Sequence, residues 1–211
     1  NLNRACPDLA NCAGDTGILL SQISDNGVVF ETKKNYAKDM VTAFIRLNGA
    51  TVGAVANRSE IYGTDGTLEE TFDGTLSAKG AKKAAAFVKF CDAFGIPVLT
   101  ITNVKGFKAT KCSEKFMAQN VAELTYAFAD ATVPKVNVVV GQAYGSAYLA
   151  MNSKSIGADM VFAWPNAEIG MMDAKAAAKI MYADEDLATI NEKAAEYATL
   201  QNNVTSAARR G

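Results

Sequence analysis

VPKVNVVVGQAYGSAYLAM, residues 133–151, is the stretch on which the fold of this chain depends. Its first part is a β-branched apolar run, Val136 to Val140, bounded by a proline and a glycine, which predicts a buried strand of a parallel sheet. A turn of small residues follows at 141–146, and residues 147–151 predict the first turns of a helix. A strand that turns directly into a helix is typical of an α/β domain.

The same turn predicts a site for a negatively charged oxygen. The first N–H groups of a helix have no partner within it, and the helix dipole favours negative charge beside them. Gly145, Ser146 and Ala147 are small enough for a ligand to approach the backbone. Two interpretations are open at this point: an oxyanion site, or a turn of small residues that serves only to redirect the chain.

Composition excludes several classes of function. The 211 residues are enough for one domain, and 49% hydrophobic residues supply a sizeable core. A net charge of −1 gives no electrostatic reason to expect nucleic acid or an acidic membrane surface as a partner. No apolar run approaches the ~20 residues of a membrane span. The start NLNRACPDLANC lacks the hydrophobic region of a signal peptide. The cysteine usage described next leads us to expect a reduced, cytoplasmic chain.

Cysteine and histidine usage argues against a metal site. The chain has no histidine, and its four cysteines are scattered. Cys6 and Cys12 lie six positions apart, which is not a zinc-ligand spacing, and Cys91 falls on an apolar helix face. We therefore expect no bound metal and reduced thiols.

Apolar periodicity predicts a hairpin followed by alternating helices and strands with crossover connections. The hairpin strands at 41–47 and 50–56 flank Asn48-Gly49, a strong turn signal. The other expected elements are a helix at 17–24, a strand start at 30–31, a loop at 57–73, a helix at 77–94, a strand at 98–102, a loop at 103–111, a helix capped by Ser113, a strand at 160–164 and helices at 174–183 and 185–202.

The helix at 77–94 has two distinct faces. An apolar face is expected in the core, and it consists of Ala84, Phe87, Val88, Cys91 and Phe94. A charged face is expected in solvent, and it consists of Lys82, Lys83, Lys89 and Asp92.

Four segments carry a family resemblance: AFIRLNGATVGAVANR (43–58), GAKKAAAFVKFCDAFGIPVLT (80–100), AFADATVPKVNVVVGQAYGSAYLAM (127–151) and FAWPNAEIGMM (162–172). In this order and spacing they resemble the C-terminal half of biotin-dependent acyl-CoA carboxyltransferases, the family of propionyl-CoA carboxylase β, transcarboxylase and glutaconyl-CoA decarboxylase α subunits. The resemblance implies an α/β fold of the crotonase-like (ClpP/crotonase) type, a ββα superhelix with crossover helices. It also implies that residues 1–211 are one C-terminal domain of a longer two-domain subunit.

The resemblance implies carboxyl transfer between carboxybiotin on a carrier protein and a short-chain acyl-CoA. The family's N-terminal half binds acyl-CoA and its C-terminal half binds carboxybiotin. Biotin would be the cofactor, carried on a separate protein or domain. The implied partners are the acyl-CoA-binding half, a biotin carboxyl carrier protein, a biotin carboxylase or decarboxylase complex, and further copies of this chain. Carboxyl transfer needs stabilised enolates rather than a titrating side chain, which suits a chain without histidine.

The family's turn supplies backbone amides to the ureido oxygen of biotin. The matching positions here are Ser146 and Ala147, which are the expected catalytic residues. The resemblance extends cofactor binding to a wider set, which consists of Gly106, Phe107, Tyr144, Gly145, Ser146, Ala147 and Leu149.

The chain departs from the family pattern at three places. Ser146 replaces a glycine and keeps its N–H, although its side chain approaches the biotin position. The loop DVPGFLPG is replaced by NVKGFKAT at 103–110. Its Lys105 and Lys108 have two interpretations: solvated loop charges, or partners of a phosphate or carboxylate. Leu149 stands where propionyl-type enzymes carry Asp beside the acyl pocket, and helix packing is its other interpretation.

Two other functions stay open. A crotonase-type hydratase or decarboxylase that acts without biotin needs a general-base carboxylate near Ser146. Residues 141–151 contain no acid, and Glu168 is the only one in the nearby motif. The second alternative is a non-catalytic assembly or binding domain, in which Ser146 and the altered loop have removed activity.

Overall fold

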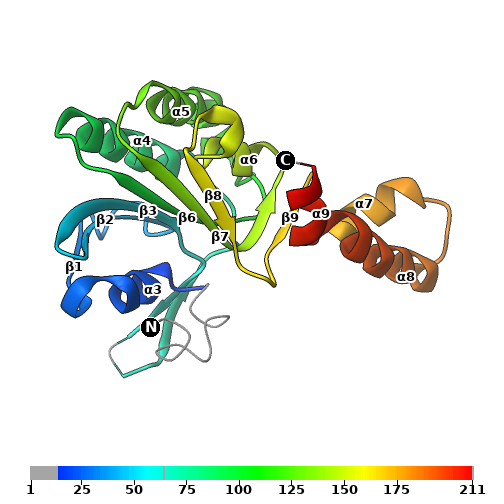
Figure 1. Cartoon of the computed structure of the whole chain (residues 1–211). Helices are drawn as coiled ribbons and strands as arrows, with labels where there is room; N and C mark the ends of the chain where they lie inside the picture. The colour runs from blue at the N-terminus through cyan, green and yellow to red at the C-terminus, as the bar shows by residue number, and fades with distance from the viewer. Residues whose placement is uncertain (1–13, 64, 211) are drawn as a thin grey trace.

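The computed structural model describes residues 14–63 and 65–210, and a mixed β-sheet forms the centre of the molecule (Figure 1). Its strands are β1 (Val29–Glu31), β2 (Met40–Leu47), β3 (Ala50–Asn57), β6 (Val98–Val104), β7 (Lys135–Tyr144), β8 (Met160–Ala163) and β9 (Glu168–Gly170). The strand order is β1-β2-β3-β6-β7-β8, and β9 pairs with the end of β7. β1, β2 and β3 are antiparallel, whereas β3, β6, β7 and β8 are parallel.

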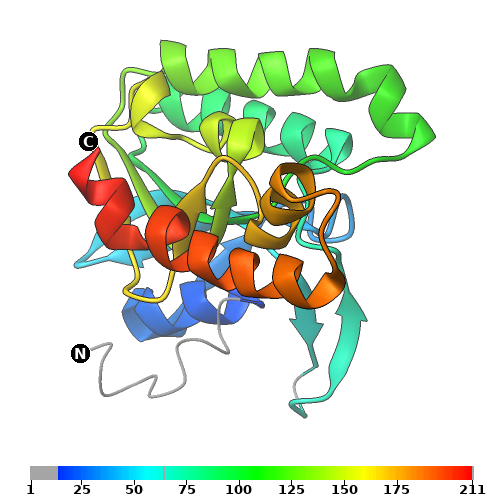
Figure 2. The ribbon, with the colours of Figure 1, turned by 90° about the vertical axis from the view of Figure 1, so that its right-hand side faces the viewer.

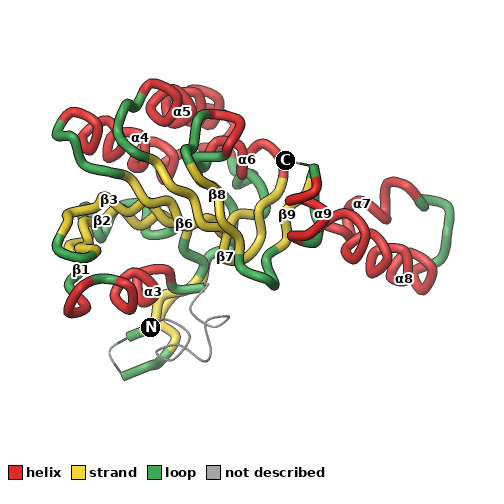
Figure 3. The backbone as a smooth tube through the Cα atoms, in the orientation of Figure 1, coloured by secondary structure: helices red, strands yellow, loops and turns green. Residues whose placement is uncertain are grey.

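Helices cover the sheet from both sides, with α4 and α5 on one face and α3 on the other (Figure 3). The α-helices are α3 (Thr16–Ile23), α4 (Ala78–Ala93), α5 (Lys111–Asp130), α6 (Gly145–Ala150), α7 (Ala174–Met181), α8 (Leu187–Tyr197) and α9 (Val204–Arg209). Shorter helical segments are η1 (Asp25–Gly27), η2 (Lys154–Ile156) and the π-helical η3 (Ala198–Asn202). Within the described ranges, no helix is both long and apolar enough to cross a membrane.

The predicted α/β fold with crossover helices is confirmed, and so is its hairpin. Asn48 and Gly49 both have positive φ values, 51° and 83°, as a tight two-residue turn between β2 and β3 requires. The helix at 77–94 is also confirmed. The Ser77 side chain accepts a hydrogen bond from the Gly80 N–H, which caps α4 at its start.

Several predicted boundaries are wrong. The expected loop at 57–73 contains β4 (Glu60–Tyr62) and β5 (Leu68–Thr71), a hairpin whose largely solvent-facing strands show no apolar alternation. The cap of α5 is Thr110, not Ser113, because the Thr110 hydroxyl accepts from the Ser113 N–H. α9 and β9 were not predicted, and the expected helix at 185–202 is α8 followed by η3.

β7 is longer than the run of β-branched residues that predicted it. The strand continues through residues 141–144, which the sequence assigned to a turn. Gln142, Ala143 and Tyr144 pair with Glu168, Ile169 and Gly170 of β9. The pairing partner, which no local pattern reveals, therefore extends the strand up to Gly145.

The C-terminal helices α7 and α8 pack against each other and project from the sheet near β9, as Figures 1 and 2 show. They leave large apolar side chains in solvent, among them Ile180, Met181 and Leu187. An apolar surface of this kind on a projecting pair is typical of a contact with another chain.

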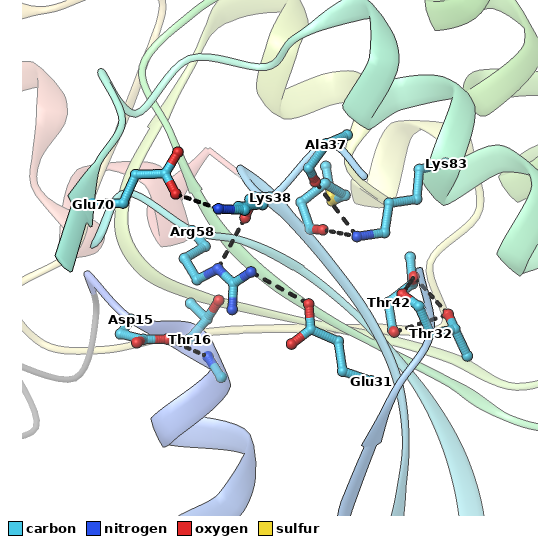
Figure 4. A network of polar contacts seen from close by, with 12 residues as sticks. Asp15, Thr16, Glu31, Thr32, Ala37, Lys38, Thr42, Arg58, Glu70 and Lys83 are labelled. Carbon is cyan, nitrogen blue, oxygen red and sulfur yellow. Dashed lines mark hydrogen bonds and ion pairs between the residues drawn. The ribbon is translucent and has the colours of Figure 1, made fainter. Parts of the chain in front are cut away.

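Two residues of α4 lie opposite to their predicted faces. Phe94, at the C-cap, is exposed rather than buried. Lys83 is only 2% exposed, whereas the sequence assigned it to solvent. Its Nζ donates to the carbonyl oxygens of Met40, at 2.6 Å, and Ala37, at 3.4 Å (Figure 4). These hydrogen bonds hold the start of β2 against α4 and give the buried ammonium polar partners.

Burial lowers the pKa of Lys83 from 10.5 to about 8, a shift that the nearby charge of Glu31 opposes in part. Glu31 is itself paired with the buried Arg58, whose Nη2 lies 3.3 Å from the carboxylate (Figure 4). A lysine that is desolvated in this way disfavours its own charged form in the folded state.

We expect this lysine to make stability depend on pH. Between about pH 8 and the unfolded pKa of 10.5, the unfolded chain binds more protons than the folded one, so stability rises with pH. The rise should be on the order of 1 kcal/mol per pH unit. The measurement is urea unfolding from about pH 7 to about pH 10, compared with Lys83→Met, which should lose the rise. Lys82→Met, at the exposed neighbouring position, is the control. If the free energy of unfolding changes with pH in the same way for wild type and Lys83→Met, the expectation is contradicted.

Candidate functional site

The carboxyl ends of three parallel strands meet at one edge of the sheet, where ligands bind in open α/β folds. Side-chain amides connect these ends. The Asn103 N–H of β6 donates to the Asn57 Oδ1 of β3 at 3.4 Å, and the Gln142 N–H of β7 donates to the Asn103 Oδ1 at 3.0 Å. Gly141 must lack a side chain, because its Cβ would lie 2.5 Å from the Asn103 Oδ1. The edge is therefore tied together before any ligand binds.

The turn from β7 into α6 lies at this edge. Gly145 has a φ of +57°, which favours glycine, and a Cβ there would lie 2.9 Å from the carbonyl oxygen of Met171. Ser146 is exposed and Ala147 is buried. Within residues 14–63 and 65–210, no acceptor contacts the N–H groups of Ser146 and Ala147, which stand second and third in α6.

α6 has only six residues, which changes one part of the expectation from sequence. A helix of this length sums few peptide dipoles, so its macrodipole contributes little to anion binding. The capacity of the turn to hold a negative oxygen rests on the individual N–H groups of Ser146 and Ala147. Two such donors directed at one oxygen are the arrangement of an oxyanion hole.

Gly106 and Phe107 belong to the loop that leaves β6 beside this turn. Val104, the last residue of β6, pairs with Ala143, so the loop begins next to the end of β7. The Leu76 N–H donates to the Gly106 carbonyl at 2.8 Å, and Leu76 forms an isolated bridge with Phe107. Phe107 as a whole residue is 37% exposed. The topology thus brings the loop and the turn to the same edge.

The cationic side chains of this loop lie near an acid. The pKa of Asp73 is lowered by hydrogen bonds from Thr75 and, to a smaller extent, by the charges of Lys108 and Lys105. Both lysines are at least partly solvated. The two lysines are therefore loop charges in contact with solvent, and the carboxylate near them is that of Asp73 within the same chain.

Leu149 lies on α6, three positions after Ser146, and is 43% exposed. Its side chain is therefore not a core packing residue, which was one of its two interpretations. Its carbonyl oxygen accepts from the Ser153 hydroxyl at 2.9 Å, which closes the end of the helix. The exposed side chain is available to a ligand or to a partner chain.

Tyr144 differs from the other expected site residues because its side chain points into the protein. It is 1% exposed, and its phenol donates a hydrogen bond to the Glu168 carboxylate. Burial, followed by this hydrogen bond, raises the pKa of Tyr144 well above its ordinary value. The phenol therefore stays protonated, and it supports the turn from the interior of the protein. Sequence analysis identified Glu168 only as an acid in a nearby motif and did not identify its partner.

The site offers donors rather than acids or bases. The described ranges hold no group of three His, Cys, Asp or Glu residues suited to a metal ion. The sequence from Gly141 to Met151 has no charged residue. Together, the fold and the turn define an α/β domain in which a parallel strand leads directly into a helix start with two backbone donors.

Comparison with known proteins identifies the family. The carboxyl transferase domain family matches residues 1–210. The chain is 39% identical to the methylmalonyl-CoA decarboxylase subunit alpha of Propionigenium modestum and 40% identical to the propionyl-CoA carboxylase beta chain of Cereibacter sphaeroides. Each alignment covers 100% of this chain and 40% of the relative. The chain belongs to the carboxyl transferase domain family.

A solved structure agrees with this assignment. Transcarboxylase 12S, a hexamer assembly with methylmalonyl-coenzyme A and methylmalonic acid bound, matches with a TM-score of 0.83 at 39% identity. The match covers 93% of this chain and 37% of the transcarboxylase chain. This chain thus spans about two fifths of the length of the proteins it matches.

The geometry of the turn predicts that replacing Gly145 destabilises the protein. Gly145→Ala places a side chain at positive φ and against the Met171 carbonyl, whereas Gly49→Ala has positive φ with no atom within 4 Å. Positive φ alone costs about 1–2 kcal/mol. We expect Gly49→Ala to lose about this much in urea unfolding and Gly145→Ala to lose at least ~1 kcal/mol more. Equal losses would show that Met171 does not restrict the turn.

Proposed function

We propose that this chain forms the biotin side of a carboxyltransferase active site, at which a carboxyl group moves between carboxybiotin on a carrier and a short-chain acyl-CoA. The observation that carries the proposal is the turn of residues 144–147, where two N–H groups that have no acceptor among the described residues lie beside a glycine at positive φ. Family membership supports the same function.

The residues present fit a biotin ureido group. Its carbonyl oxygen is an acceptor that needs donors, and Ser146 and Ala147 offer two backbone N–H groups. The glycine at 145 removes the side chain that would separate the ligand from the backbone. Gly106 and Phe107 lie on the adjoining loop and would border the ligand. When bound, carboxybiotin supplies the carboxyl group, and this chain's amides hold the ureido oxygen as it becomes negative.

The partners are part of the proposal. Since the chain spans 40% of its relatives, we propose that it is the C-terminal domain of a longer subunit whose other half binds acyl-CoA. Biotin would arrive on a carrier protein, within a carboxylase or decarboxylase complex. The exposed apolar side chains of α7 and α8 support association with further copies. The scattered cysteines of the sequence are the basis on which we also propose a reducing, cytoplasmic location.

A crotonase-type reaction without biotin is less well supported. Such a reaction needs a carboxylate free to move a proton near Ser146. Glu168 is the acid of the nearby motif, but its carboxylate accepts a hydrogen bond from the buried Tyr144. That contact assigns the side chain to the support of the turn.

Reconstitution tests the proposed function. This chain is combined with the acyl-CoA-binding half, and loss of the carboxyl group from methylmalonyl-CoA and malonyl-CoA is followed with and without free biotin. The names of the relatives make methylmalonyl-CoA the first substrate to test. We expect loss that requires both biotin and this chain. Loss without biotin would favour the crotonase-type decarboxylase, and no loss in an assembled complex would favour the non-catalytic domain.

The N–H of Ser146 can be tested separately. Ser146→Pro removes this donor, and proline is accepted in the first turn of a helix, so the fold should be kept. Loss of one oxyanion donor should lower kcat on the order of 100-fold. Ser146→Ala keeps the N–H and is the matched control. Equal rates for Ser146→Pro and Ser146→Ala would show that the Ser146 N–H is not part of the proposed site. If the wild-type chain does not bind biotin and Ser146→Gly does, the result would favour the non-catalytic domain.

A further inference from the structure

A partly buried hydrogen bond lies next to the proposed site. The Tyr144 phenol donates to the Glu168 carboxylate, which joins the last residue of β7 to the first residue of β9. The pairing of Tyr144 with Gly170 brings the two strands together at the same place. Gly145 follows Tyr144 immediately, so any movement of Tyr144 shifts the peptide units of the turn.

The segment after β9 packs against the same turn. The Met171 carbonyl oxygen occupies the space in which a Gly145 side chain would lie. The Met172 carbonyl accepts from the Asn202 Nδ2 at 3.1 Å, and Asn202 is fully buried at the end of η3. Asn202 also contacts the Tyr144 hydroxyl. The turn is thus held by β9 and, through Asn202, by the C-terminal helices.

This arrangement has little freedom to adjust. Gly170 must lack a side chain, since its Cβ would lie 2.2 Å from the Asn202 Oδ1. Among the described residues, that oxygen is one of two buried side-chain atoms without a hydrogen-bond partner. A buried polar atom without a partner destabilises the folded state, and such groups persist where the surrounding packing requires them.

We propose that Glu168 is a positioning residue: its hydrogen bond with Tyr144 fixes the Gly145–Ala147 peptide units in the orientation that the carboxyl-transfer reaction uses. The inference rests on the proposed function, because it assigns a use to the same amides. Glu168 acts through Tyr144 and need not contact the ligand. Donors in an oxyanion site must point at the position of the developing charge before the reaction, so a small rotation of the turn lowers the rate.

Three variants test the assignment in the reconstituted complex. Glu168→Ala and Tyr144→Phe remove the hydrogen bond, and Glu168→Gln keeps an acceptor for the phenol. We expect the first two to lower kcat for biotin-dependent carboxyl loss by about 10-fold or more, with KM for the acyl-CoA within about 2-fold. Glu168→Gln should retain most of the activity. Because the two residues act as one unit, the double variant should lose no more than either single variant.

A second measurement is independent of activity. Amide hydrogen exchange of the segment 141–151 should rise in Glu168→Ala and Tyr144→Phe by about 10-fold or more and stay near wild type in Glu168→Gln. Thr42→Val is the matched control, since it removes the partly buried Thr42–Thr32 hydrogen bond on β2, which three strand pairings separate from β7. It should change neither the exchange of this segment nor kcat per folded complex.

The outcomes separate the two proposals. Biotin-dependent activity in wild type with unchanged kcat and exchange in Glu168→Ala would overturn the positioning role and leave the proposed function in place. Equal losses in Glu168→Ala, Glu168→Gln and Thr42→Val would also overturn it, since they would indicate a general effect on stability. No activity in wild type, together with the expected exchange pattern, would overturn the proposed function and support the fixing of the turn by Glu168.

Discussion

The structure depends on the hydrogen-bonded edges of β7. One edge pairs with β6 along almost the whole strand, and the other pairs first with β8 and then with β9. A parallel strand that is paired on both edges has its backbone polar groups satisfied and can be buried on both faces. The last of these pairings sets the point at which the strand gives way to α6, and so places the N–H groups of Ser146 and Ala147.

Elsewhere in the domain, hydrogen bonds from polar side chains fix the positions of strands and helices relative to one another. Asn103 connects the ends of three strands by accepting and donating between backbone and side-chain groups. Lys83 attaches the start of β2 to α4 through two carbonyl oxygens, although its burial disfavours the charge. Hydrogen bonds are directional and packing is not. These contacts therefore define the relative positions of elements that the apolar core only holds together.

Much of the fold could be predicted from sequence because its signals are local. The Asn48-Gly49 turn, the capping of α4 by Ser77 and the β-branched run of β7 each depend on neighbouring residues alone. The features that were predicted wrongly depend on residues that are distant in the sequence. The extension of β7 needs β9, and the burial of Lys83 needs carbonyl oxygens more than forty positions away. The site shows the same division: the small residues at 145–147 are visible in sequence, whereas the Tyr144–Glu168 contact exists only in the folded chain.

The parallel pairing of β3 with β6 has a consequence for how the chain folds. Ala54 pairs with Leu99, and Leu99 with Val136, so each contact closes a long loop that contains an entire helix. Closing such loops loses chain entropy before the contacts form, which slows folding in proteins whose contacts are mainly non-local. The β2–β3 hairpin closes over two residues and can form early. By this argument we expect the strands of the proposed site to pair after the hairpin, and until they do the unpaired backbone N–H and C=O groups of β7 are available to other chains.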